Sequence, residues 1–178
     1  MDHVAIIGAG ASTLAGDLVT VGYRHLYAVD ISDISLEQLH TSLGDRAAAV
    51  TYIRADVRTI TFDRPVDVWH DRATLHFLTD PADQAAYAAQ ATAAVRPGGH
   101  VVLAVFAPDG PEQCSGLPVT RHSPSSLTEL FGNGFTLVES FEQDHRTPSG
   151  ADQRFLHALL SRNATGSAPP KFRNVAGR

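Results

Sequence analysis

The sequence predicts one α/β domain, a doubly wound fold built on a seven-stranded, mostly parallel sheet. Short apolar runs alternate with helical patterns over residues 4–106, which is typical of parallel strands joined by helices. The first apolar run leads into glycines that open a helix. Two extended runs near the C-terminus predict an antiparallel β-hairpin at one edge of the sheet.

The N-terminal half contains four of the expected strands. Gly22 and Gly44 each follow a run with helical spacing, at a position where glycine commonly ends a helix. Ser32 or Asp33 supplies an N-cap for the second helix. We therefore expect strands at residues 4–7, 25–31, 50–54 and 66–70, and helices at residues 14–21 and 33–43.

The C-terminal half begins with Asp80 and Pro81, which predict a helix start because proline fits the first helical position. The Pro, Gly, Cys and Ser content between Ala107 and Pro118 predicts a long loop. The remaining expectations are a helix at 81–95, a break at 96–99, a strand at 100–106, a helix at 123–130 and strands at 135–141 and 153–160. The domain then spans residues 1–162, and residues 163–178 are expected to form a disordered tail.

Composition excludes several classes of protein. The net charge of −5 and the single lysine give no basic surface for nucleic acid. No apolar run approaches the roughly 20 residues of a membrane span, and the first residues lack a signal peptide pattern, so we expect a cytoplasmic protein. The single cysteine excludes an internal disulfide. The nine histidines are scattered without ligand spacing, so no metal site is expected.

The first strand leads into Gly8-Ala9-Gly10, and the second strand ends in Asp30. Glycines let the backbone turn sharply and approach a ligand. A helix beginning near Ser12 directs free N–H groups at a negative group in the turn. A carboxylate at the end of the second strand suits the hydroxyls of a ribose. The pattern predicts a nucleoside site, and the alternative is a tight turn without a ligand.

The order of elements resembles the class I S-adenosylmethionine-dependent methyltransferases over about residues 4–161. The resemblance rests on five β-α units followed by a hairpin, on acids ending the second and third strands, and on Pro97-Gly98-Gly99 before the fifth strand. Four runs are similar to a group of small bacterial methyltransferases of unassigned substrate: Val68–Arg72, His76–Pro81, Phe106–Pro111 and Cys114–Pro118. The resemblance implies a Rossmann-like methyltransferase fold and S-adenosylmethionine as cofactor.

The resemblance also implies where the cofactor is held. It places the methionine part against the glycine turn, Asp30 on the ribose, and Asp56 at an adenine that lies between Ile31 and Val57. The implied cofactor-binding residues are Gly8, Ala9, Gly10, Ser12, Asp30, Ile31, Asp56, Val57 and His70. Each acid alone has an alternative role as a helix cap or turn former.

Two departures from the superfamily pattern matter. The acid that usually lies two residues before the first glycine is Ile6 here, which predicts a weaker hold on the methionine ammonium. The first strand begins almost directly after Met1, so the N-terminal lid helices of relatives are absent from this sequence. We expect a truncated chain, a lid supplied from elsewhere, or a protein that no longer catalyses. A homodimer that closes the cleft, or weak cofactor binding, would follow.

Catalysis is expected from His70, Asp71 and Arg72 at the end of the fourth strand, with His76 nearby. Methyl transfer chiefly needs alignment of the nucleophile and exclusion of water. An imidazole suits proton removal at neutral pH. The alternative is a polar network that pins the following loop, or a set of cofactor contacts.

The predicted function is S-adenosylmethionine-dependent methyl transfer to an unidentified acceptor, either a small molecule or a protein. One alternative is a noncatalytic protein that binds S-adenosylmethionine or S-adenosylhomocysteine. A second is a nicotinamide-dependent oxidoreductase, whose usual third glycine is Thr13 here and whose substrate domain is missing.

Overall fold

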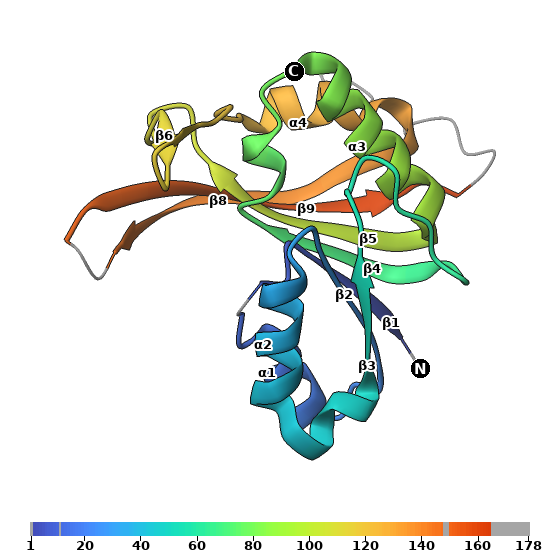
Figure 1. Cartoon of the computed structure of the whole chain (residues 1–178). Helices are drawn as coiled ribbons and strands as arrows, with labels where there is room; N and C mark the ends of the chain where they lie inside the picture. Colours follow the sequence, from blue (N-terminus) through green and yellow to red (C-terminus); the bar gives the residue numbers. More distant parts are fainter. Residues whose placement is uncertain (1, 11, 148–149, 165–178) are drawn as a thin grey trace, which may run out of the picture.

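The computed structural model describes residues 2–10, 12–147 and 150–164, and a twisted seven-stranded sheet forms its centre (Figure 1). The strands of this sheet are β1 (His3–Ile7), β2 (His25–Asp30), β3 (Val50–Arg54), β4 (Val66–Arg72), β5 (Val95–Phe106), β8 (Phe135–Arg146) and β9 (Asp152–Arg162). Their order is β3-β2-β1-β4-β5-β9-β8, with β1 to β5 parallel and the β8–β9 hairpin antiparallel. The predicted fold class is confirmed.

Helices cover both faces of the sheet. They are α1 (Leu14–Thr20), α2 (Asp33–Leu43), α3 (Pro81–Ala94) and α4 (Pro124–Phe131), with short 3-10 turns η1 (Gly44–Ala49), η2 (Leu75–Phe77) and η3 (Gly132–Gly134). Helices α1 and α2 lie on one side, and α3 and α4 on the other (Figure 1). Ser32 caps α2, Asp80 caps α3 and Ser123 caps α4, because each side chain accepts a hydrogen bond from a first-turn N–H.

Strand β1 shows why the central strands have no polar face. Its alternate residues point to opposite faces. Val4 and Ile6 pack with α1 and α2, whereas Ala5 and Ile7 pack in the core that includes α3 and α4. Both sets are buried, so the strand is a continuous apolar run.

The neighbours of β1 explain where a ligand binds in this fold. Strand β1 pairs with β2 on one side and with β4 on the other, and the chain reverses its direction across the sheet at that point. Crossovers leaving the two sides go to opposite faces, which opens a crevice beyond the carboxyl ends of β1 and β4. The fold thus places Gly8 and Arg72 at the same edge.

Strand β5 begins at Val95, directly after α3, whereas a break was expected at residues 96–99. The pairing with β4 jumps from Val66↔Val95 to Val68↔His100, so the Pro-Gly-Gly segment forms a bulge inside the strand. A Cβ on Gly99 would lie 2.8 Å from the Asp67 carbonyl oxygen. Glycine is needed there because two backbones approach closely, and no break in the strand results.

The expected loop at 107–118 contains a small hairpin. Strands β6 (Gln113–Cys114) and β7 (Leu117–Pro118) pair antiparallel. Ser115 and Gly116 connect them with φ angles of +51° and +78°. Two successive positive φ values match the tight turn that joins such short strands. The expectation of an irregular loop was therefore wrong for this part.

Other boundaries differ by a few residues. Helix α1 begins at Leu14, as the helical spacing predicted, and it ends at Thr20, one residue before the expected end. Strand β4 continues through Arg72, so Asp71 and Arg72 belong to the strand. The β8–β9 hairpin is longer than expected and projects beyond the other strands (Figure 1).

The start of the predicted tail is ordered. Asn163 donates from its backbone N–H to the Gly134 carbonyl at 2.9 Å, and its side chain bonds Thr136 and Asn133. Asn163 is thus attached to η3 and β8, and residues 165–178 of the predicted tail lie outside the described residues. Within the described ranges, no helix combines the length and the apolar character that a membrane span requires.

Candidate active site

The glycine turn after β1 has the backbone geometry that the sequence predicted. Gly8 has a φ of +61° and Gly10 a φ of +47°, both in the left-handed region that favours glycine. A Cβ on Gly8 would lie 2.0 Å from the Oγ1 atom of Thr74, which follows β4. The turn therefore lies against the segment after β4. Ala11, within the same turn, lies outside the described residues.

Asp30 holds the glycine turn and the end of β2 together. Its Oδ2 accepts from the Gly10 N–H at 2.9 Å, and its Oδ1 accepts from the Ser32 N–H at 2.9 Å. Each carboxylate oxygen can accept a further hydrogen bond. Asp30 is also half-buried in the wall of a cavity. It is thus positioned both to fix the turn and to meet a ligand.

The first cavity has a volume of about 670 Å³ and lies beyond the carboxyl ends of β1, β2, β3 and β4. Its walls combine the predicted cofactor residues with apolar side chains from the segment after β4 and from β7. The lining residues are Ile7, Gly8, Val29, Asp30, Ile31, Ala55, Asp56, Val57, Arg58, Arg72, Ala73, Thr74, Phe77, Leu78, Thr79, Asp83, Leu117 and Pro118. Ile31 is 72% exposed and Leu117 57% exposed, so the apolar rim of this cavity faces solvent.

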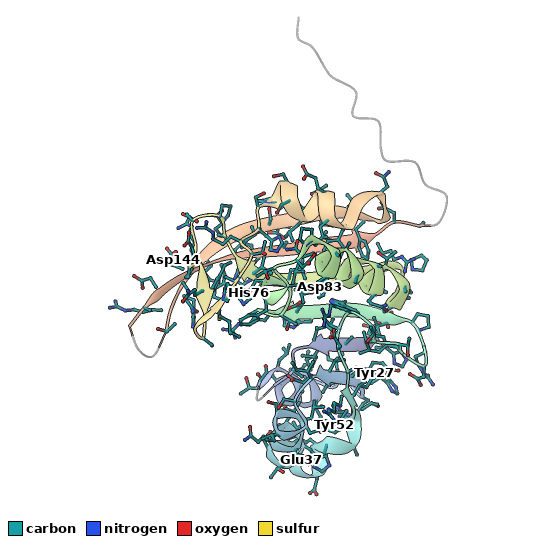
Figure 2. The ribbon with its side chains drawn as sticks, turned by 45° about the horizontal axis from the view of Figure 1, so that its top comes forward. Tyr27, Glu37, Tyr52, His76, Asp83 and Asp144 are labelled. Atoms are coloured by element: carbon teal, nitrogen blue, oxygen red, sulfur yellow. The ribbon has the colours of Figure 1, made fainter. Side chains whose placement is uncertain are left out.

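Asp56 lies in this cavity but is bound by Arg58. The Arg58 Nη2 atom is 2.5 Å from Asp56 Oδ2, and Arg58 Nη1 is 2.8 Å from Asp83 Oδ1 on α3. The hydrogen bonds from the Arg58 side chain and backbone lower the pKa of Asp56. Arg58 therefore joins the end of β3 to α3 across the wall of the cavity, a link that sequence reasoning missed. Figure 2 labels Asp83 on α3.

Asp71 is fully buried and lines none of the cavities described here. Its carboxylate accepts from the Thr74 N–H at 2.8 Å, the Leu75 N–H at 3.0 Å and the Tyr87 hydroxyl at 2.6 Å. Burial raises its pKa to about 6, and these hydrogen bonds oppose the increase. Asp71 is placed to hold the turn that carries Thr74. This is the polar network that the sequence left open as the alternative to catalysis.

His70 and Arg72 project into a second cavity of about 570 Å³ on the other side of the glycine turn. Burial and the nearby Arg72 charge lower the pKa of His70, so its imidazole is neutral at pH 7. The buried Nδ1 atom of His70 has no hydrogen-bond partner among the described residues. The same cavity is lined by Gly8, Ala9, Gly10 and Ser12 from the predicted cofactor set. The structure thus brings His70, Arg72 and the glycine turn together.

Several residues of the two cavities were not predicted as site residues. Thr74, Phe77 and Leu117 line the first cavity, and Gln153 and Phe155 of β9 line the second. The β9 residues are distant in the chain and reach the site only because the hairpin returns beside β5. Their alternation within a predicted strand was the available signal, but it does not say which face meets a site.

His76 follows the predicted catalytic residues in the chain and is fully buried. Its ring lies 4.6 Å from the Phe106 ring, and its backbone carbonyl accepts from the Thr120 N–H at 2.7 Å (Figure 2). Burial lowers the pKa of both His76 and the nearby His122 to about 4. Both imidazoles are therefore neutral core groups beneath the site.

The residues of the first cavity fit the predicted cofactor. Asp30 retains acceptor capacity for a ribose diol, and Ile31 and Val57 provide apolar surface for a flat ring. Gly8 leaves room that a Cβ would fill. Ile6 offers no carboxylate at the position where an ammonium is usually held. No cluster of three or more potential metal ligands occurs within residues 2–10, 12–147 and 150–164.

Curated relatives share part of the chain. The eEF1A lysine and N-terminal methyltransferase of Mus musculus is 32% identical over 81 residues, and that of Homo sapiens is 31% identical over 85 residues. These segments are 44% and 47% of this chain but only 12% of each relative. The match therefore spans a small part of those proteins.

Solved structures share the fold. A SAM-dependent methyltransferase from Methanosarcina mazei aligns with a TM-score of 0.75 at 13% identity, covering 91% of this chain and 92% of that one. The N-methyltransferase NodS from Bradyrhizobium japonicum, solved with S-adenosyl-L-homocysteine, aligns with a TM-score of 0.73 at 14% identity, covering 92% and 79%. A family described as a methyltransferase domain matches residues 4–99, more than half of the chain. The chain therefore belongs to the methyltransferase-domain family and has the class I S-adenosylmethionine-dependent methyltransferase fold.

Proposed function

We propose that this protein transfers a methyl group from S-adenosylmethionine to an acceptor bound beside the glycine turn. The observation that carries the proposal is Asp30, which ties the glycine turn to β2 while it lines a cavity at the sheet edge. A carboxylate in that place can accept from ribose hydroxyls without any change in the turn. Family membership supports the same reaction.

The cofactor site is proposed to lie in the first cavity. Asp30 would hold the ribose, Ile31 and Val57 would enclose the adenine, and Gly8 to Gly10 would face the methionine part. Asp56 would meet the adenine edge while still bound to Arg58. When bound, the cofactor supplies a methyl group on a sulfonium, which is already electrophilic. The protein must chiefly orient the nucleophile and exclude water.

His70 is proposed as the base that removes a proton from the acceptor. Its side chain lines the second cavity together with Gly8 and Gly10. A base must be neutral at the working pH, and the lowered pKa of His70 leaves the imidazole free to accept a proton. Asp71 is proposed as a positioning residue, because it holds the Thr74 turn from within the core.

Calorimetry with S-adenosylhomocysteine and with NAD tests the cofactor. Binding of S-adenosylhomocysteine alone is expected, and binding of NAD alone would assign the fold to an oxidoreductase. Transfer of a labelled methyl group into fractionated cell extract then separates an enzyme from a noncatalytic binder. His70→Gln should reduce the rate of methyl transfer by about 100-fold without weakening the binding of S-adenosylhomocysteine. His40→Gln on α2, remote from both cavities, is the matched control.

We also propose that the protein is bacterial and cytoplasmic, that it forms a homodimer, and that its acceptor is a small molecule or a protein. The exposed apolar rim formed by Ile31 and Leu117 supports a partner that covers the cleft. Light scattering and calorimetry on one sample test this point. A monomer that binds the cofactor at nanomolar strength would argue against both a dimer and a weakened site.

A further inference from the structure

Arg72 and His157 flank one small residue on the face of the sheet that carries His70. Arg72 pairs with Ala104 across β4 and β5, and Ala104 pairs with His157 across β5 and β9. Residues in register on neighbouring strands point to the same face. His70 lies two residues before Arg72 and therefore shares that face. Arg72, Ala104 and His157 form one row across the sheet.

The two ends of this row line one cavity. Neighbouring strands lie about 4.8 Å apart, so the backbones of Arg72 and His157 are separated by about 10 Å. The cavity has a volume of about 270 Å³ and is lined by Arg72, Gln143, Asp144, His145, Phe155 and His157, whereas Ala104 is buried beneath the row. Arg72 also lines the first and second cavities. It is therefore shared by the proposed cofactor site and this third cavity.

The charges in this region are unbalanced at Arg72. Within the described residues, its exposed guanidinium has no hydrogen-bond or ion-pair partner, and it lines three cavities. Asp144 in the same wall is engaged by Arg154 at 3.3 Å. Asp17, the carboxylate of the second cavity, is exposed on α1. A planar guanidinium without a partner suits two parallel hydrogen bonds to an oxyanion.

His157 adds a second, oriented donor. Its ring stacks on Phe141 at 4.8 Å with an interplanar angle of 8°, so two adjacent strands hold it in place. A neutral imidazole carries one N–H donor and one acceptor nitrogen. Arg72 supplies the charge, and His157 supplies a directed hydrogen bond from the opposite side of Ala104.

We propose that the methyl acceptor is a small molecule with a carboxylate or phosphate group, and that Arg72 and His157 bind this oxyanion in the cavity that both of them line. This inference rests on the proposed methyl transfer. It assigns the recognition end of the acceptor to the β8–β9 hairpin and the reacting end to the neighbourhood of His70. A protonated amine would meet the unpaired Arg72 charge, which disfavours it as the recognised group.

The test uses the full chain loaded with S-adenosylhomocysteine and three probes of similar shape. Benzoate and phenyl phosphate carry the two oxyanions, and benzamide is the neutral counterpart. NMR of the His70 and His157 imidazoles, assigned with His70→Gln and His157→Gln, follows titration to about 10 mM. Both imidazoles should shift with at least one anion and remain unchanged with benzamide. The probe that binds more tightly shows whether the recognised group is a carboxylate or a phosphate.

Arg72→Gln should weaken anion binding by at least about tenfold, and Arg72→Lys should recover part of it because the charge remains without the planar fork. His157→Gln should also weaken anion binding, because His157 lines the same cavity. It should leave S-adenosylhomocysteine affinity within about twofold, because His157 lines neither the first nor the second cavity. The matched control is Arg54→Gln, an exposed arginine at the end of β3 paired with Asp33.

Three results would overturn the inference. Equal binding of benzamide would show that no oxyanion is recognised, and the absence of a shift with either anion would show that the row is not a binding site. A loss of S-adenosylhomocysteine affinity in Arg72→Gln with unchanged anion binding would assign Arg72 to the cofactor. Failure of the native chain to bind S-adenosylhomocysteine at all is a separate result, since it would contradict the proposed methyl transfer itself.

Discussion

The cleft has two halves: the cofactor half is the first cavity, around Asp30 and Asp56, and the acceptor half is the second cavity, around His70 and Arg72. The two halves differ in whether their polar side chains have partners. On the proposed cofactor half, Asp30 accepts from two backbone N–H groups and Asp56 is bound by Arg58. On the acceptor half, the His70 Nδ1 atom and the Arg72 guanidinium have no partner among the described residues. The first half is held in place by its own hydrogen bonds, whereas the second half contains polar groups without a partner among the described residues.

This contrast has a physical reason. A cofactor of constant structure is bound best by a site that is already formed, because little ordering remains to be done on binding. Groups that must take a proton or meet an anion need free lone pairs or N–H donors. Asp71 connects the two halves, since it fixes the Thr74 turn from the core while Thr74 contacts the glycine turn.

Gly8→Ala should cause the largest loss of cofactor affinity, because it changes the glycine turn of the cofactor half directly. The new Cβ would lie 2.0 Å from Thr74 Oγ1, and a φ of +61° disfavours any side chain. We expect S-adenosylhomocysteine affinity to fall by about 100-fold, or about 3 kcal/mol, in calorimetry. Gly44→Ala is the matched control, since Gly44 has a φ of +54° with nothing within 4 Å.

Gly44→Ala should cost about 1 kcal/mol of stability and leave binding unchanged. Adding Thr74→Ala to Gly8→Ala should restore part of the affinity, because it removes the clashing hydroxyl. If Gly8→Ala bound S-adenosylhomocysteine normally, the turn would not be the preformed element that this contrast requires.

Acidification should lower the free energy of unfolding through two buried histidines, His76 and His122. His76 and His122 have folded pKa values of about 4, below the ordinary 6.5, so the unfolded chain binds more protons between these values. Their contribution to stability is complete above pH 6.5 and is lost as the pH falls towards 4. Asp71, with a folded pKa raised to about 6 from 3.8, acts in the opposite direction between those values.

Two histidines outweigh one aspartate, so the free energy of unfolding should fall by about 3 kcal/mol between pH 6.5 and 4. Urea unfolding across this range measures it. The double variant His76→Leu/His122→Leu should abolish this decrease, because only the opposite contribution of Asp71 would remain. An equally steep decrease in that variant would assign the acid sensitivity to other groups.

Asp30→Asn should weaken the binding of S-adenosylhomocysteine by about 2 kcal/mol, because the ribose and one backbone N–H lose a charged hydrogen-bond acceptor. Calorimetry measures the loss. Asp33→Asn, three residues later on the exposed surface of α2, is the control and should bind normally. Unchanged affinity in Asp30→Asn would leave Asp30 a purely structural cap of the turn.

Arg58→Gln should have the smallest effect. Its ion pairs with Asp56 and Asp83 join partners that are more than one third exposed, and such pairs contribute little. S-adenosylhomocysteine affinity should change by less than about fivefold, and the pKa of Asp56 should rise when its main hydrogen-bond donor is lost. A much larger loss of affinity would mean that Arg58 itself contacts the cofactor.

The order of strands and helices, the glycine turn and the acids at the ends of β2 and β3 could all be predicted from the sequence. These are local features, because a strand end, a cap or a positive φ depends on a few neighbouring residues. Ser32, Asp80 and Ser123 all cap helices as such patterns predict. Pro97 to Gly99 shows the limit, since the same residues form a bulge when a neighbouring backbone lies close.

Which polar groups have partners depends instead on how distant segments pack together in the folded chain. His70, Asp71 and Arg72 are consecutive and looked equivalent, yet strand alternation turns Asp71 into the core and the other two towards the cavity. His157 meets Arg72 only because β9 pairs with β5 in one register. Such contacts depend on strand order and register across the whole sheet, and no local pattern in the chain encodes them.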